Sequence, residues 1–239
     1  MTARGRNARH GFTLVELLIV IGIIVLLMSV LFFSFRGAFS SRDEARATAT
    51  IETLRGNLES FEARWGVSPP GNLKDLSALT RTMNLMPPND LNEGIETLVL
   101  ALRMQREGGP YLDGELLADD GRRSNLDADN VLPEVAGPGG LDLPEDSSPE
   151  LFEVLDPWGN PLVYVNIAEL RQGVGQQSVQ LASGEVVVID LTTAQEKLRH
   201  PVTGQFPAGY AIWSFGEDGV NDYGRGDDIT SWAKYEDVK

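Results

Sequence analysis

The chain of 239 residues contains no cysteine and only two histidines. Without cysteine it cannot form a disulfide bond, a zinc–thiolate site, an iron–sulfur cluster or a cysteine nucleophile. Two histidines leave little for a histidine-rich metal site or a histidine-based triad. We therefore expect the fold to be held by packing and by metal binding.

Basic residues are also scarce, since 20 Lys and Arg face 35 Asp and Glu, for a net charge of −15. Nucleic-acid binding needs a basic face, so the composition argues against nucleic acid as a partner. The imbalance is uneven, because residues 113–150 hold 11 acidic and 2 basic residues. The length is sufficient for one or two domains with a substantial core.

The first 35 residues are the exception to this acidity. Three basic residues and no acidic one precede an apolar run from Phe12 to Phe35, in which Glu16 is the one charge. At about 1.5 Å per residue, 24 helical residues extend roughly 36 Å, enough to span a bilayer. The run is longer than the apolar core of an ordinary cleaved signal peptide. Arginines lie on both sides of it, so charge counting leaves its orientation open.

Glu16 is the unusual residue of this span. A carboxylate inside an apolar helix is costly and needs a partner. If the chain began at Phe12, the new α-amine would be the nearest cation. The alternative is a carboxylate that is stabilised by the helix N-terminus and reaches toward water.

The segment Gly11-Phe12-Thr13-Leu14-Val15-Glu16 resembles the prepilin motif shared by type IV pilins and type II secretion pseudopilins. The resemblance implies cleavage after Gly11 by prepilin peptidase and N-methylation of Phe12. It also implies that Glu16 pairs with the N-terminal amine of a neighbouring subunit during assembly. The leader would be residues 1–11, and the transmembrane and assembly helix residues 12–35.

The apolar spacing predicts that this helix continues over residues 36–65. Five apolar residues recur at intervals of three and four and form one stripe for packing on a globular domain: Ile51, Leu54, Leu58, Phe61 and Trp65. Gly66 and the Pro69-Pro70-Gly71 segment end the helix. A restart capped by Ser40 or Ser41 is the alternative to one continuous helix.

The remaining chain divides into a helical and loop insertion, residues 66–155, and a β region, residues 156–239. We expect short helices over residues 73–79 and 95–102, the second with a capping box at Asp90 and Glu93 and an end at residues 108–110. A long acidic loop occupies residues 113–150. Within it, Asp127, Asp129 and Asn130 offer oxygen ligands, although most such clusters are solvated.

Four short runs rich in β-branched or aromatic residues predict strands at 162–165, 179–181, 186–189 and 210–215. Ser183-Gly184 predicts a hairpin between the second and third. Helices followed by strands indicate an α+β fold, with a long N-terminal helix packed on a small antiparallel sheet, as in type IV pilins.

Two motifs in the β region extend the resemblance. Residues 156–161, Asp-Pro-Trp-Gly-Asn-Pro, predict a rigid turn before a strand, with Trp158 packed on the core, and resemble a turn of the major pseudopilin of type II secretion. Residues 214–229 combine glycines with crowded carboxylates, which repel one another unless a hard cation joins them. This loop resembles the C-terminal calcium loop of major pseudopilins.

The second resemblance implies a calcium site with side chains from Asp218, Asp227 and Asp228 and the backbone oxygen of Phe215. The acidic pair lies further along the loop than in many relatives, so the roles of Val220 and Asp222 stay open. The loop lacks the ligand order of an EF-hand.

Together these features are similar to those of a pseudopilus subunit that is not an enzyme. The resemblance implies a single pass of the inner membrane and a periplasmic C-terminal domain. The implied partners are other copies of the chain, minor pseudopilins, the inner-membrane secretion platform and prepilin peptidase. Two alternatives are a type IV pilin of a surface filament and a membrane-anchored calcium-binding envelope protein that does not polymerise.

Overall fold

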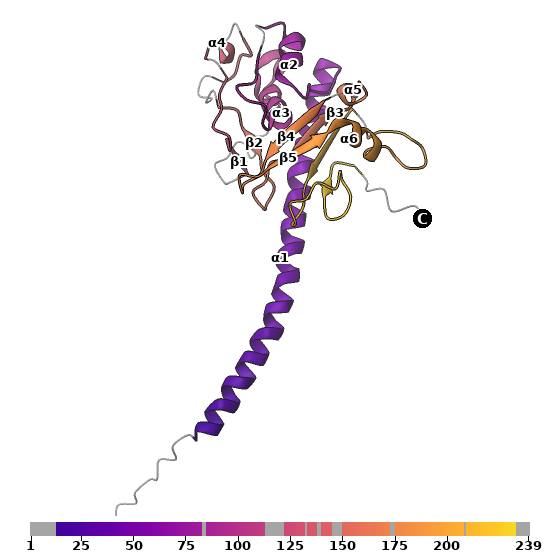
Figure 1. Ribbon diagram of the computed structural model, residues 1–239. Coiled ribbons are helices and arrows are strands. Elements are labelled where there is room, and N and C mark those ends of the chain that lie inside the picture. The colour runs from indigo at the N-terminus through magenta and orange to yellow at the C-terminus, as the bar shows by residue number, and fades with distance from the viewer. Residues whose placement is uncertain are drawn as a thin grey trace, which may run out of the picture. The chain divides into compact units, whose positions relative to one another are not determined.

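The computed structural model describes residues 13–82, 85–112, 122–131, 133–137, 140–144, 150–172, 175–207 and 209–232, with the backbone alone at 30–39, 133 and 134. It contains two compact units, Met1–Arg42 and Asp43–Lys239. Helix α1 (Leu14–Trp65) supplies residues to both units and is continuous through Ser40 and Ser41, so the capped restart is wrong (Figure 1). No proline interrupts this segment, and the backbone ladder therefore continues.

The first unit presents an apolar surface along α1. Thirteen large apolar side chains between Leu14 and Met28 are exposed, each by 43% or more. Among the described residues, no helix combines the length and the apolarity of a membrane span. Residues 12 and 30–35 of the predicted span lie outside the part for which side chains are described.

The second unit is built around the C-terminal part of α1. Ile51, Leu54, Leu58 and Phe61 are each exposed by 1% or less, which confirms the predicted stripe, and Trp65 packs at its edge. The stripe shares one core with apolar residues of α2 (Leu73–Thr80) and α3 (Glu93–Arg103). Because this face is fully covered, the C-terminal part of α1 is an integral part of the second unit.

Helix α3 begins differently from the prediction. Its N-cap is Asn92, at a φ of 52° and without a side-chain capping bond, so the capping box at Asp90 and Glu93 is wrong. The Glu93 carboxylate instead accepts the N–H of Leu73 at 3.0 Å, at the start of α2. The helix ends at Arg103, and a separate 3₁₀ turn, η1, occupies Arg106–Gly108.

The described residues form three antiparallel sheets, which together with the helices confirm the α+β class. The central sheet has the order β3 (Val163–Asn166), β6 (Tyr210–Ser214), β7 (Ile229–Thr230), with Tyr164 opposite Ile212 and Ser214 opposite Ile229. Strands β4 (Gln176–Gln180) and β5 (Val186–Asp190) form the predicted hairpin. Strands β1 (Arg123–Ser124) and β2 (Glu153–Val154) form the third sheet.

The central sheet separates two cores. Tyr164 and Ile212 belong to the core that contains the α1 stripe, whereas Val163 and Trp213 belong to the other. This alternation follows from the period of two along a strand. The second core also includes residues of the β4–β5 hairpin, α5 (Ile167–Leu170) and α6 (Leu191–Lys197) (Figure 1).

The segment 113–150 is more ordered in its described part than the predicted loop. Residues 113–121, 132, 138–139 and 145–149 lie outside the described residues. The described remainder contains β1 and the one-turn helix α4 (Pro133–Ala136). Val131, Val135, Leu141 and Leu143 are buried in the first core. Apolar residues spaced along the acidic sequence therefore attach it to the domain.

Candidate functional sites: the helix start and two acidic loops

The start of α1 is held by a reciprocal capping arrangement between Thr13 and Glu16. One carboxylate oxygen of Glu16 accepts the backbone N–H of Thr13 at 2.9 Å and the Thr13 hydroxyl at 2.8 Å. The Thr13 hydroxyl in turn accepts the N–H of Glu16 at 3.2 Å. This is the capping box of a Thr-x-x-Glu sequence, in which two free donors of the first turn are satisfied.

This arrangement gives Glu16 a partner within its own chain. The sequence pointed to the N-terminal amine as its partner, and the spacing of three residues to Thr13 was the signal for the cap. The predicted cleavage and methylation positions, Gly11 and Phe12, lie outside the described residues. The role of Glu16 in assembly stays a prediction.

The predicted turn at residues 156–161 is closed by hydrogen bonds to Asp156. Asp156 is 4% exposed, and its Oδ1 accepts the N–H groups of Trp158 and Asn160 at 3.0 and 2.9 Å. Its Oδ2 accepts the Ser214 hydroxyl at 2.6 Å. Burial raises the pKa of Asp156, and these hydrogen bonds counteract the effect. Trp158 is only half-buried, so its predicted place in the core is wrong: the aspartate organises the turn.

The C-terminal acidic loop connects β6 to β7. Phe215 follows β6 and is fully buried, and Asp228 precedes β7 with no exposed surface. The two ends of the loop are joined because Ser214 pairs with Ile229. The loop backbone turns at Gly216, where φ is +68° and a Cβ atom would lie 2.6 Å from an Asp227 carboxylate oxygen. Glycine is therefore required there by both conformation and space.

The predicted calcium ligands in this loop differ in their exposure and in their hydrogen bonds. Asp218 is exposed and its Oδ1 accepts the N–H of Val220 at 2.8 Å, while Asp227 accepts the N–H of Asp218 at 3.2 Å. Asp228 accepts the N–H of Gly224 at 2.7 Å through Oδ2, whereas its buried Oδ1 has no partner. Burial, followed by the nearby carboxylates of Asp222 and Asp227, raises the pKa of Asp228 to about 7.

The three side chains do not form a compact cage in the structure. In the described part of the chain, one group of three carboxylates has oxygens within 4.8 Å of one another, and it is elsewhere: Glu96, Asp127 and Glu153. Calcium binding at Phe215, Asp218, Asp227 and Asp228 therefore stays a prediction. The unpartnered oxygen of Asp228 is the feature that favours it, because a buried carboxylate oxygen requires a donor or a cation.

The second acidic group includes part of the Asp127–Asn130 segment that the sequence singled out. Its other members, Glu96 and Glu153, lie on α3 and β2 and were missed by the sequence analysis. A signal was present for Glu96, since it is the one charged residue in the run Ile95–Leu102, which is apolar apart from Glu96 and Thr97.

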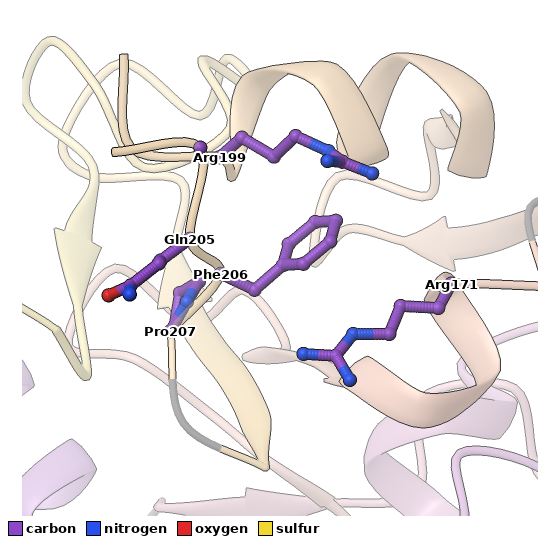
Figure 2. A pocket seen from close by; sticks show the side chains of 6 residues that line it. Arg171, Arg199, Gln205, Phe206 and Pro207 are labelled. Atoms are coloured by element: carbon purple, nitrogen blue, oxygen red, sulfur yellow. The ribbon is translucent and has the colours of Figure 1, made fainter. Parts of the chain in front are cut away.

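A pocket in the second unit is lined by none of the acidic residues described above. Figure 2 shows the Phe206 ring between the side chains of Arg171 and Arg199. The guanidinium carbons lie 5.6 and 4.5 Å from the ring centroid, which is the geometry of cation–π contacts. These contacts account for the two arginines as packing partners of Phe206.

Comparison with known proteins bears on the N-terminal segment. Residues 6–32 match the model of the prokaryotic N-terminal methylation motif. No curated protein and no solved structure gives a significant match to the chain. The motif spans the predicted cleavage position, Thr13 and Glu16, and it is the signal that prepilin peptidase processes. The N-terminal methylation motif thus marks the chain as a type IV pilin-like protein.

Proposed function

We propose that the chain is a structural subunit of a type II secretion pseudopilus. The observation that carries this proposal is the N-terminal methylation motif over residues 6–32, which is followed by an α+β domain. In the proposal, prepilin peptidase cleaves after Gly11 and Phe12 becomes the methylated N-terminus. The mature chain is anchored in the inner membrane, its globular domain lies in the periplasm, and it then assembles into a filament that helps to export proteins.

The exposed apolar surface of α1 supports an assembly role. The large apolar residues between Leu14 and Met28 are exposed on all sides of the helix. A helix that is apolar all round requires an apolar environment. Lipid provides that environment before assembly, and the helices of neighbouring copies provide it in the filament. We therefore propose that the subunit acts by assembly and not by catalysis.

Glu16 supports the same proposal through its present hydrogen bonds. Both bonds that it accepts come from Thr13, which is one residue from the new N-terminus after cleavage. A carboxylate bound to neutral donors is available to exchange them for the charged amine of a neighbouring subunit. Such a charge-assisted hydrogen bond is shorter and stronger than a neutral one.

The C-terminal loop is proposed to bind Ca²⁺ through Asp218, Asp227, Asp228 and the backbone oxygen of Phe215. Asp228 is buried with one free carboxylate oxygen, and glycines allow the loop to wrap around an ion. Ca²⁺ accepts six to eight oxygen ligands, including backbone carbonyls. Binding would add to domain stability, because the ion offsets the repulsion among the carboxylates.

The proposal is tested first at processing. The chain is expressed together with a prepilin peptidase, and the mature protein is analysed by mass spectrometry. We expect an N-terminal peptide that begins at N-methylated Phe12. An intact Met1, or an N-terminus near Ser41, would contradict the assignment.

A pair of variants then separates the two roles of Glu16. Glu16→Gln retains the capping geometry, because glutamine also serves at this position of a capping box, whereas Glu16→Ala removes both cap and charge. If assembly depends on the charge, both variants are cleaved normally and neither enters filaments. Filaments that contain Glu16→Gln at the wild-type level would show that the capping bond alone matters.

The type of filament is decided in the native cell. Deletion of the gene is expected to abolish protein secretion through the outer membrane. Complementation with the wild-type gene is expected to restore it. Intact secretion together with loss of surface filaments would favour the alternative, a type IV pilin.

A further inference from the structure

Four carboxylates gather in the second unit, away from the C-terminal acidic loop. We name this group the α3 acidic cluster: Glu96, Asp127, Asp129 and Glu153. Glu96 comes from the first turn of α3, Glu153 from β2, and the two aspartates from the segment that follows β1. Oxygens of Glu96, Asp127 and Glu153 all lie within 4.8 Å of one another.

The cluster is withdrawn from water. Glu153 and Glu96 are 0% and 1% exposed, Asp129 is 6% exposed, and Asp127 is half-buried. Three of the inward oxygens, Glu96 Oε1, Asp127 Oδ1 and Asp129 Oδ1, are buried and have no hydrogen-bond partner. Unpaired buried carboxylate oxygens are costly, and close like charges add repulsion. A clustered group of this kind needs protons or a cation.

Among the side chains that the structure describes, no basic one forms an ion pair with the α3 acidic cluster. Burial, with the neighbouring carboxylates as the next cause, raises the pKa of Glu96 to about 10 and that of Asp129 to about 7. The chain therefore gathers acidic groups here without a basic partner, so that either protons or a cation must neutralise them.

The outer side of the cluster is organised by amide donors. Asn89 Nδ2 donates to Asp127 Oδ2 at 2.9 Å and to Asp129 Oδ2 at 3.3 Å. Asn92 donates to Glu153 Oε1 at 2.8 Å, and the N–H of Leu126 lies 3.1 Å from Glu153 Oε2. These bonds fix one oxygen of each aspartate and leave the other free. The same arrangement is found where outer groups orient the ligands of a metal ion.

The backbone between the two aspartates is bent to allow this. Ala128 has a φ of 59°, which is uncommon for a residue with a Cβ atom, and the Asn125 side chain closes the turn on the backbone of Asp129. The bend brings Asp127 and Asp129 to one amide of Asn89. The observed strain thus coincides with the convergence of the carboxylates.

We propose that the α3 acidic cluster binds a hard divalent cation, with Glu96, Asp127 and Glu153 as the central ligands and Asp129 beside them. All donors are oxygens, which suit Ca²⁺ and Mg²⁺, and neither histidine nor cysteine contributes. A bound ion links α3, β2 and the segment after β1. It thereby fastens the described part of the 113–150 segment to the core. This site is independent of the proposed secretion function.

The test uses the full mature chain in detergent, stripped with EDTA and titrated calorimetrically with CaCl₂, and in parallel with MgCl₂. Glu96→Gln replaces a central carboxyl ligand by an amide at nearly constant volume. We expect the number of bound ions per chain to fall by one, or the affinity at this site to fall at least tenfold. Asp127→Asn is the second variant, because its half-buried side chain imposes less on folding.

Controls separate this site from others. Asp90→Asn removes an exposed acid nearby and is expected to leave cation binding unchanged. Asp228→Asn reports on the C-terminal loop and is expected to leave the ion at the α3 acidic cluster in place. If only Asp228→Asn abolished binding, the proposal for the α3 acidic cluster would be overturned and that for the C-terminal loop supported.

Thermal unfolding distinguishes ligands from merely structural residues. The wild-type chain is expected to melt at a higher temperature with Ca²⁺ or Mg²⁺ than with EDTA. In EDTA, Glu96→Gln is expected to melt near the wild-type temperature because glutamine occupies nearly the same volume, and the cation adds less to it than to the wild type. Equal cation-induced shifts in wild type, Glu96→Gln and Asp127→Asn would contradict the proposal.

Discussion

The hydroxyl of Ser214 donates a hydrogen bond of 2.6 Å to the buried Oδ2 of Asp156, across 58 positions of sequence. The same hydroxyl oxygen accepts the N–H of Gly216 at 3.1 Å. Ser214 therefore connects the turn at residues 156–161 with the first residues of the C-terminal acidic loop. The two motifs that the sequence analysis treated separately form one hydrogen-bonded unit.

The first prediction concerns this connection. Ser214→Ala leaves a buried carboxylate oxygen without its donor, so we expect the free energy of unfolding to fall by about 1–3 kcal/mol. Urea denaturation of the full chain in detergent provides the measurement. Ser183→Ala, at an exposed hairpin position, is the matched control and is expected to change stability by less than about 0.5 kcal/mol. Equal effects of the two variants would show that the Asp156 contact contributes nothing.

The second prediction concerns Gly216. The backbone has a similar positive φ at Gly216 and at Gly204, +68° and +65°, so alanine is strained at both positions. A Cβ at Gly216 would also collide with Asp227, whereas Gly204 has open space around it. We expect Gly204→Ala to cost about 1–2 kcal/mol, the conformational penalty, and Gly216→Ala to cost clearly more. Comparable unfolding midpoints for the two variants would contradict the close approach of Asp227.

The third prediction is a pH dependence that originates at Glu169. Burial raises the pKa of Glu169 to about 7, although the N–H of Gly71 and the Asn72 amide bind its oxygens. Asp75, Glu93 and Tyr164 are the titratable groups whose electrostatic coupling involves this carboxylate. Since the folded pKa lies above the unfolded value of about 4.3, the folded state binds the proton more tightly.

Stability from Glu169 is thus greatest at low pH and decreases as the pH rises from about 4 to about 7. We expect Glu169→Gln to lessen that decrease relative to wild type, with both chains measured at a fixed EDTA concentration. Urea denaturation at several pH values from 4.5 to 8 provides the comparison. Parallel pH profiles for the two proteins would show that Glu169 does not titrate in this range.

The fourth prediction tests the packing of α1. Leu58 has no exposed surface and belongs to the core that includes α3 and the central sheet. Leu58→Ala removes its buried methyl groups and leaves a cavity, which costs about 2–5 kcal/mol. Its neighbour Glu59 is exposed, so Glu59→Ala is expected to have an effect of less than about 0.5 kcal/mol. A small effect of Leu58→Ala would mean that this part of α1 is not integral to the domain.

Features that depend on residues close in sequence were predicted correctly, whereas features that depend on long-range contacts were not. The α1 stripe and the β4–β5 hairpin depend on near neighbours, and both were predicted. The start of α3 was mispredicted because Glu93 bonds to Leu73, a contact over 20 positions that no local pattern reveals. Trp158 was predicted to pack on the core, but it is half-buried, and the turn is organised by hydrogen bonds to Asp156.

The sequence by itself determined the N-terminal signal, the α+β class and the long first helix. Each of them depends on contiguous residues or on the short-range spacing of apolar residues. The Thr13–Glu16 cap is equally local, because its signal is the spacing of three residues between Thr13 and Glu16. Tertiary structure alone decided which carboxylates meet. Glu96 and Glu153 are 57 positions apart, and only the packing of α3 beside β2 brings them to Asp127. Charge clustering of this kind depends on distances in space, which a one-dimensional pattern does not contain.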